Sequence, residues 1–438
     1  MATASKKMQA RVFKLGKSTF LKLLLFGILI SYFYNLAVFK YSITGSNELR
    51  LYDFLGLLIL YQFVINLDLL LWFINRKRYL RYLWTFIRWC LFMMIFTFLI
   101  SYITGRLTWI LRTTLFMYHF LTFYFSFVFF LILMRNPKVL RQFVYLQILM
   151  AIIATLVVLG QHFGAIAYLW SDIDKKAYAG FLSGILGPNK IVLGMVMMTS
   201  LITFIGLFFE RSLKINRIFL IAGILFTIIA LSLSGSRTSY VGLLVFALYF
   251  FVKSTGKFLY MSVVVGIGFL AISAYNSEVF TIIADVFNGR VTDKLSDPSL
   301  ITQGDVGGLY EDLGAGRKNL SVKYIDYLLT HLYVVPFGSG FNNFILVGNS
   351  AHNIYLTLIN EVGLVGLYFY VRWLLNYFSI EYRRFKYLGI AMKGLVLSMM
   401  VTLLFGEHLY VYRPVFAILG LFLFSTAILI TPRYYKKV

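Results

Sequence analysis

The sequence predicts an all-α polytopic membrane protein with about twelve transmembrane helices and one long external loop that carries short helices. Of the 438 residues, 60% are hydrophobic and only 13% are charged, whereas soluble globular domains carry about 25% charged residues. Apolar runs of about 20 residues, the length of a membrane-spanning helix, recur along the chain. Strands of a membrane β-barrel would instead show short alternating segments, so we expect the spans to be helices.

The net charge of +24 would suit a nucleic-acid-binding surface, because phosphate binding needs clustered lysines and arginines. In this chain, however, the basic residues lie mostly in short connectors that follow every second apolar run. The positive-inside rule predicts such connectors on the cytoplasmic side of a membrane. We therefore expect membrane lipid around the protein and no nucleic-acid partner.

The first five spans alternate with basic connectors. A basic cluster from Lys6 to Lys17 precedes the first run, and no small-residue cleavage site follows it, so we expect an uncleaved span and a cytoplasmic N-terminus. The runs lie at about 20–40, 52–74, 83–103, 113–134 and 143–163. Asp68 lies inside the second run, where an acid is usually paired. Cys90, the single cysteine, excludes a disulfide framework and a thiolate metal site.

The remaining spans flank a long polar segment. They are expected at about 190–209, 217–233, 238–252 and 258–275, then from near Asn353, at 388–405 and at 414–431. If successive spans cross the membrane in alternate directions, every second connector lies in the cytoplasm. Those connectors hold more than half of the 41 lysines and arginines, and their only acidic residues are Glu210 and Glu381. This agreement predicts both termini in the cytoplasm and divides the chain into spans 1–275, an extracytoplasmic loop 276–351 and spans 352–438.

The loop is not a basic patch, because it holds five lysines and arginines against eight acidic residues. An anion bound there must therefore be held by individually placed arginines. Leu320, Tyr324 and Leu328 follow Arg317 at helical spacing. This spacing predicts an amphipathic helix that lies on the membrane surface.

Three side chains at the borders and in the middle of this loop could carry chemistry. Arg237 follows Ser234-Gly235-Ser236 at the outer end of a span, and its guanidinium suits phosphate, although arginines at span ends also snorkel to the interface. Arg317, taken alone, fits a solvated loop cation better. His352 lies at the water–membrane boundary and could act as a base, or form a hydrogen bond at a helix start.

Four motifs follow one another in the second half of the chain. They are Gly187-Pro188-Asn189, Leu231-Ser232-Leu233-Ser234-Gly235-Ser236-Arg237, Gly316-Arg317 with Pro336-Phe337-Gly338-Ser339-Gly340, and Ala351-His352-Asn353-Ile354-Tyr355-Leu356 with Asn360-Glu361-Val362-Gly363-Leu364-Val365-Gly366. Their order and spacing resemble the bacterial O-antigen ligase and O-antigen polymerase family. The resemblance covers about 180–370, and the first five spans share only their hydrophobicity with the family.

The resemblance implies a GT-C-like fold in the bacterial inner membrane and an inverting glycosyltransferase that needs no metal and no cofactor. The donor would be a glycan on undecaprenyl pyrophosphate, and the acceptor a glycan or lipid-linked hydroxyl on the external face. Two arginines and a histidine are essential in the family, and they correspond to Arg237, Arg317 and His352. The arginines would stabilise the leaving pyrophosphate, and His352 would deprotonate or orient the acceptor. A chain-length regulator protein is a further implied partner.

Four more residues are candidates for substrate binding. Asn189 and Asn353 each precede a span, and Asn353 would cap its helix or form a hydrogen bond near the site. Arg413 could add a phosphate contact, or snorkel to the interface from the last span. Glu361 lies about 13 Å deeper than His352 along a helix; a carboxylate there usually fixes a packing partner or orients an arginine, and we favour that structural role. Gly363 and Gly366 are expected to allow close helix packing.

Two alternatives from other classes stay open. Asp172 and Asp174 could hold a divalent cation for a metal-dependent transferase, although a solvated turn explains them better. A flippase or transporter of lipid-linked oligosaccharides would have an arginine-lined cavity, but the matching halves typical of transporters are not found. Within the family, polymerase and ligase share the motifs, and a ligase would use lipid A-core or protein as acceptor. We favour a polymerase, because the chain has no second large external loop to dock a bulky acceptor.

Overall fold

The protein is built almost entirely from helices in the computed structural model, which describes residues 2–35, 37–40, 48–169, 182–187, 189–275, 277–288, 317–343, 351–382, 385–410 and 417–431. In chain order the helices are α1 (Ala2–Leu15), α2 (Thr19–Ser31), α3 (Leu51–Ile65), α4 (Leu67–Arg76), α5 (Arg78–Ile103), α6 (Thr108–Leu133), α7 (Pro137–His162), α9 (Lys190–Phe208), α10 (Arg217–Leu233), α11 (Arg237–Lys253), α12 (Thr255–Tyr275), α13 (Ser277–Phe287), α17 (Arg317–Thr330), α18 (Val334–Phe337), α19 (Ile354–Asn376), α20 (Lys386–Thr402) and α21 (Ile418–Ile430). Two short 3-10 helices cover Arg211–Leu213 and Tyr377–Ser379.

The prediction of a helical membrane protein is confirmed. Helices α5, α6, α7 and α9, and α19 together with the 3-10 turn that follows it, are each long and apolar enough to cross a membrane. Helices α2, α10, α12 and α21 are shorter apolar helices. One feature departs from the all-helical expectation: strands β1 (Ala37–Lys40) and β2 (Glu48–Arg50) pair antiparallel, so the first predicted span ends at Ser31 instead of continuing to about residue 40.

Serine and asparagine start many of these helices. The side chain of the residue before the helix accepts a backbone N–H of the first turn at Ser18, Asn136, Asn189, Asn216, Ser236 and Asn353. Such caps satisfy N–H groups that have no partner inside the helix. The short polar residues between the apolar runs therefore determine where each helix begins.

The second predicted span, about 52–74, is wrong as one continuous helix. Helices α3 and α4 meet at an angle of 88°, and the residue between them, Asn66, has non-helical φ and ψ of −109° and 22°. Its Nδ2 donates to the carbonyl of Gln62 at 3.0 Å. Asp68 is exposed in the first turn of α4, where a carboxylate stabilises a helix N-terminus. Asp68 therefore supports a new helix start and is not buried inside a span.

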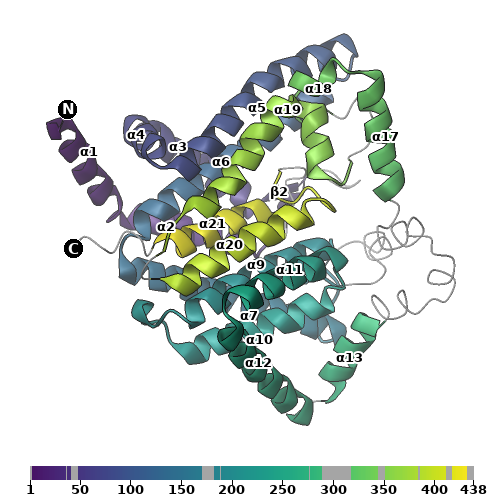
Figure 1. Ribbon diagram of the computed structural model, residues 1–438. Helices are drawn as coiled ribbons and strands as arrows, with labels where there is room; N and C mark the ends of the chain where they lie inside the picture. The colour runs from purple at the N-terminus through teal and green to yellow at the C-terminus, as the bar shows by residue number, and fades with distance from the viewer. Residues whose placement is uncertain are drawn as a thin grey trace.

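Helix α9 lies at the centre of the second half of the chain. It is buried along almost its whole length and contacts α7, α10, α11, α20 and α21. Figure 1 shows α9, α11 and α20 next to one another, with α17 on the right of the view, above the right-hand ends of α11 and α20. A helix that is apolar all round must be covered on all sides, which explains why the other helices gather around α9.

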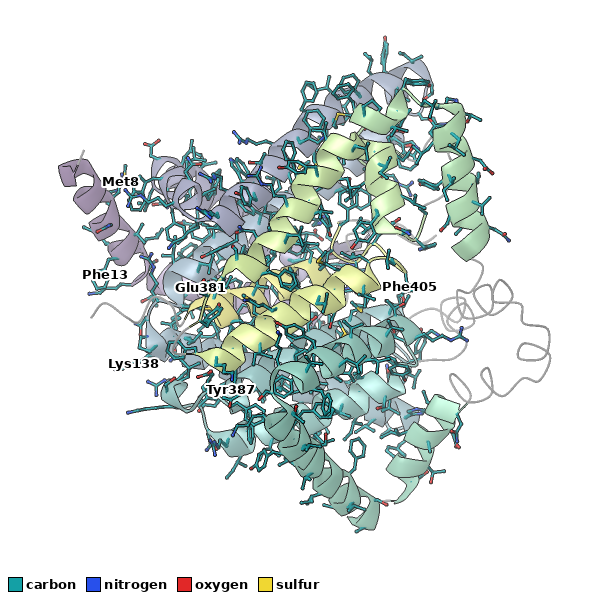
Figure 2. All side chains as sticks on the ribbon, viewed as in Figure 1. Met8, Phe13, Lys138, Glu381, Tyr387 and Phe405 are labelled. Atoms are coloured by element: carbon teal, nitrogen blue, oxygen red, sulfur yellow. The ribbon has the colours of Figure 1, made fainter. Side chains whose placement is uncertain are left out.

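The two ends of the bundle carry different connectors. Met8, Phe13, Lys138, Glu381 and Tyr387 lie on one side of the molecule, and Phe405 lies on the opposite side (Figure 2). We call these the Glu381 end and the Phe405 end. The five residues at the Glu381 end belong to segments that the charge pattern predicted on one side of the membrane, and Phe405 is the last residue of the predicted span 388–405. These six residues therefore lie at the ends of the bundle that the alternation of basic and non-basic connectors predicted for them.

Candidate functional site

A three-residue turn positions Arg237. Helix α10 ends at Leu233 and α11 begins at Arg237. Gly235 has a φ of 55°, in the left-handed region that glycine adopts with little strain. The Oγ of Ser236 accepts the N–H of Ser239 at 3.4 Å, and its own N–H donates to Ser234 Oγ at 3.2 Å. The tight turn predicted from Ser-Gly-Ser is confirmed, and it holds a half-buried Arg237 at the first position of a helix.

Helix α9 passes directly beneath this turn. A Cβ atom at Gly194 would lie 2.4 Å from Ser239 Oγ and 2.8 Å from Ser236 Cβ, so only glycine allows this approach. Asn189 lies five residues earlier and caps α9, since its Oδ1 accepts the N–H of Ile191 at 2.9 Å. The carboxamide oxygen of Asn189 is thus used for capping, and a role in substrate binding stays a prediction.

The beginning of α19 positions His352. This residue is exposed and has a φ of 51°. Asn353 Oδ1 accepts the N–H groups of Tyr355 and Leu356 at 3.0 and 3.4 Å, which confirms the predicted helix cap. The N–H of Ile354 donates to the carbonyl of Leu403 at 3.0 Å. His352 is therefore held at a helix start that is tied to the end of α20.

Helices α11 and α20 run antiparallel and in close contact. A Cβ atom at Gly242 would lie 2.7 Å from Thr402 Cγ2, and one at Gly394 would lie 2.7 Å from Phe246 Cδ2. Arg237 comes five residues before Gly242, which is about 7.5 Å along the helix axis. The first turn of α11 therefore extends past the last residue of α20, toward the Phe405 end.

Arg237 and His352 are consequently brought to the same end of the bundle. Arg237 extends beyond Thr402 along α11, and His352 stands two residues before Ile354, whose N–H bonds to Leu403. The two candidates are far apart in the sequence, but helix α20 ends between the elements that carry them. The structure thus places both candidates at one end of the bundle, and an active centre there stays a prediction.

Helix α17 confirms the predicted helix after Arg317. Tyr324 and Leu328 are buried, and Leu320 is half-buried. Tyr324 packs against Ala351, the residue before His352, with Leu356 beside them. Arg317 is the first residue of this helix, and its side chain lies outside the described part of the structure. Its helix therefore packs next to His352, and where its guanidinium lies stays a prediction.

Two buried titratable side chains in the connector after α20 had been assigned no role from the sequence. Glu407 and His408 are each 6% exposed. Thr402 Oγ1 and His408 Nε2 lie 2.8 Å apart, and Thr357 Oγ1 donates to Glu407 Oε1. Thr357 lies on α19, five residues after His352. An acid next to a histidine at the outer end of a span was the signal that could have found this pair.

Glu361 has the structural environment that we favoured from the sequence. Its side chain is 2% exposed, and its Oε2 accepts the N–H of Asn342 at 2.7 Å and the hydroxyl of Tyr410 at 2.6 Å. These contacts join α19 to two other segments. A role in substrate binding stays a prediction. Arg413, Asp172 and Asp174 lie outside the described residues.

Helix α19 is interrupted at Gly363, where a Cβ atom would lie 2.4 Å from the backbone of Phe337, so the expected close packing at this glycine is confirmed. Its φ and ψ are 69° and −178°, a conformation that is open essentially to glycine alone. The carbonyls of Asn360 and Glu361 accept the N–H groups of Ser339 and Gly340 at 2.7 and 2.9 Å. The break therefore replaces helical hydrogen bonds by bonds to a segment that precedes α19 in the chain.

That segment belongs to the predicted external loop, yet part of it lies inside the bundle. The N–H of Phe341 donates to the carbonyl of Met93 at 3.3 Å, and its carbonyl accepts the Thr97 hydroxyl at 2.7 Å, so it packs against α5. Irregular backbone inside a membrane is tolerated where protein buries it. Residues 338–343 thus pack into the helical bundle, at the end of the segment that the sequence predicted as an external loop.

Comparison with models of known protein families finds no match, and a search of curated proteins finds no significant relative. The resemblance to O-antigen ligases and polymerases therefore stays a prediction from the four sequence motifs.

Proposed function

We propose that this protein is an integral-membrane glycosyltransferase, most simply a polymerase of O-antigen or another surface polysaccharide. It would move a glycan from undecaprenyl pyrophosphate to an acceptor hydroxyl. The observation that carries this proposal is the common position of Arg237 and His352 past the end of α20, beside the helix that begins with Arg317.

The chemistry of these side chains fits the transfer. The acceptor oxygen would attack the anomeric carbon, the bond from that carbon to the pyrophosphate oxygen would break, and the acceptor proton would pass to His352. Direct attack inverts the anomeric centre. Arg237 stands at a helix N-terminus, where the backbone itself favours anions, and its guanidinium would stabilise the charge that develops on the pyrophosphate. With Arg317 as a second cation, no metal or cofactor is needed.

The proposal includes a GT-C-like membrane architecture. The twelve predicted spans would lie in the bacterial inner membrane with both termini in the cytoplasm, so that the Phe405 end faces the periplasm or exterior. Support comes from the basic connectors and from the separation of the six labelled residues in Figure 2. A chain-length regulator would be a further partner, and membrane lipid would surround the spans.

The direct test is glycan transfer by the purified protein in detergent, with a lipid-pyrophosphate donor, an acceptor and EDTA present. Arg237→Ala is expected to lower the rate about 100-fold or more, the scale of losing one transition-state donor. Lys253→Ala is the matched control, because Lys253 is an exposed cation at the opposite end of the same helix. Full activity of Arg237→Ala, or complete loss with EDTA, would contradict the proposal.

Two products of a deletion strain separate the closest alternatives. Single capped repeats on a glycan gel indicate a lost polymerase, while full-length lipid-linked chains that never reach lipid A-core or protein indicate a lost ligase.

A transporter of lipid-linked glycans is a second candidate, favoured by the interruptions at Asn66 and Gly363, since broken helices form transporter sites. Movement of the donor across proteoliposomes without formation of a glycosidic bond would identify that class.

A further inference from the structure

An exposed arginine lies on a face of α19 far from the candidate site. Arg372 is nine residues before Glu381 and so lies toward the Glu381 end, away from His352. Helix α19 is one of the spans. A charged side chain that faces lipid is unfavourable unless it finds a partner. We therefore expect Arg372 to bind a partner of opposite charge.

Two tyrosines hold the guanidinium in a fixed orientation. Arg372 Nη1 donates to Tyr368 Oη and its Nη2 donates to Tyr82 Oη, both at 3.1 Å. The Tyr82 ring centre also lies 4.3 Å from Arg372 Cζ. Within the described ranges no carboxylate pairs with Arg372, and phenol hydroxyls leave its positive charge uncompensated. Since a guanidinium has five N–H donors, it retains donors for a further ligand.

The surface next to this guanidinium is mostly apolar and open to the surroundings. A shallow groove of about 440 Å³ runs along one face of α19, over Leu364, Leu367, Tyr368, Val371, Arg372 and Leu375. Leu364 lies eight residues before Arg372, about 12 Å further from the Glu381 end along the helix axis. The groove therefore joins one cationic group near the end of a span to an apolar track that runs toward the middle of the bundle.

More positive charge lies near the Arg372 end of the groove. Arg81 lies over the Tyr82 ring, with its Cζ 5.7 Å from the ring centre. Arg76, Lys77 and Arg78 stand where α4 gives way to α5, just before Tyr82. Basic groups at the edge of a span attract anionic headgroups. The charge and the shape of this surface thus favour the same occupant.

We propose that this groove is a binding site for one anionic phospholipid. The phosphate of the headgroup binds to the fork of Arg372 that Tyr82 and Tyr368 orient, and an acyl chain lies along the leucines toward Leu364. This orientation has the headgroup toward the Glu381 end and the chain toward the centre of the bundle, as in a membrane leaflet. A guanidinium and a phosphate form the strong, paired hydrogen bonds that distinguish such a site from ordinary lipid contact.

The experiment is native mass spectrometry of the full-length protein in detergent with equal amounts of phosphatidylglycerol and phosphatidylcholine that have identical acyl chains. The wild-type protein is expected to retain one phosphatidylglycerol preferentially. Arg372→Gln should lower the ratio of the two affinities about tenfold, because a hydrogen bond to a charged group is lost. Arg88→Gln is the control, since Arg88 is an exposed cation elsewhere on α5, and it should keep the wild-type ratio.

A second variant keeps the test independent of folding. Tyr82→Phe with Tyr368→Phe retains the packing and the charge but removes the hydroxyls that orient Arg372, so the preference should fall between those of wild type and Arg372→Gln. Equal retention of the two lipids by the wild-type protein would overturn the proposal. The same preference in wild type and in both variants would overturn it as well.

Discussion

The substitution Gly363→Ala tests the interrupted helix most directly. Alanine at a φ of 69° and ψ of −178° would be strained by about 1–3 kcal/mol. Its Cβ would also lie 2.4 Å from the backbone of Pro336 and Phe337, which cannot yield as a side chain would. Displacing that backbone breaks the two hydrogen bonds from Ser339 and Gly340, at about 1 kcal/mol each. We expect the free energy of unfolding to fall by about 3–5 kcal/mol in total.

The assay is unfolding of the detergent-solubilised protein by added sodium dodecyl sulfate, followed by tryptophan fluorescence. Gly266→Ala is the control, because a Cβ atom at Gly266, in α12, would have no other atom within 4 Å, and alanine favours a helix by about 1 kcal/mol there. Trp89→Phe offers a milder change, since Trp89 Nε1 donates to the carbonyl of Val362 at 2.8 Å. If α19 were a continuous helix, Gly363→Ala would stabilise the protein as Gly266→Ala does, and the reasoning would be refuted.

Two further predictions concern acids away from the candidate site. Burial raises the pKa of Glu210 above 4.5, and the hydrogen bonds from the N–H groups of Tyr387 and Leu388 offset only part of this rise. The stabilising contribution of Glu210 is therefore complete below pH 4.5. It is lost as the pH rises through the raised pKa. Melting curves at pH 5 and 8 should accordingly differ less for Glu210→Gln than for wild type, and an unchanged difference would argue against this acid. Asp53→Asn removes the carboxylate from the hydrogen bond between Asp53 Oδ1 and His119 Nε2, which joins α3 to α6, and should lower the free energy of unfolding by about 2 kcal/mol. The exposed Asp68→Asn should cost less than about 1 kcal/mol, the contribution of a carboxylate at a helix N-terminus, and equal losses in denaturant titrations of the two variants would contradict the pairing.

Local patterns were sufficient to predict most helices. Hydrophobic runs, basic connectors and capping residues act over a few positions, so the helix from Lys190, the turn before Arg237 and the helix after Arg317 could all be read from neighbouring residues. The spacing of Tyr324 and Leu328 likewise predicted an apolar helix face. We expected that face on the membrane surface, and in the structure both side chains are buried within the protein. These features depend on residues close together in the chain.

The broken helices and the composition of the site depended on distant partners. Gly363 can leave the helical conformation because Ser339, Gly340 and Trp89 donate hydrogen bonds to the carbonyls that lose their helical partners. Nothing near Gly363 in the sequence indicates these three donors. Glu407 also depended on a distant partner, since its bond to Thr357 forms only when the connector after α20 packs against α19.

The sequence by itself thus determined the membrane class, the order of the helices and which polar residues stand at their ends, because hydrophobicity and capping are local. Only the tertiary structure decided that Arg237 and His352 share one end of α20, that residues 338–343 enter the bundle and that Tyr82 of α5 contacts Arg372 of α19. A buried backbone or charged group must find a partner, and in this protein those partners come from helices that are far apart along the chain.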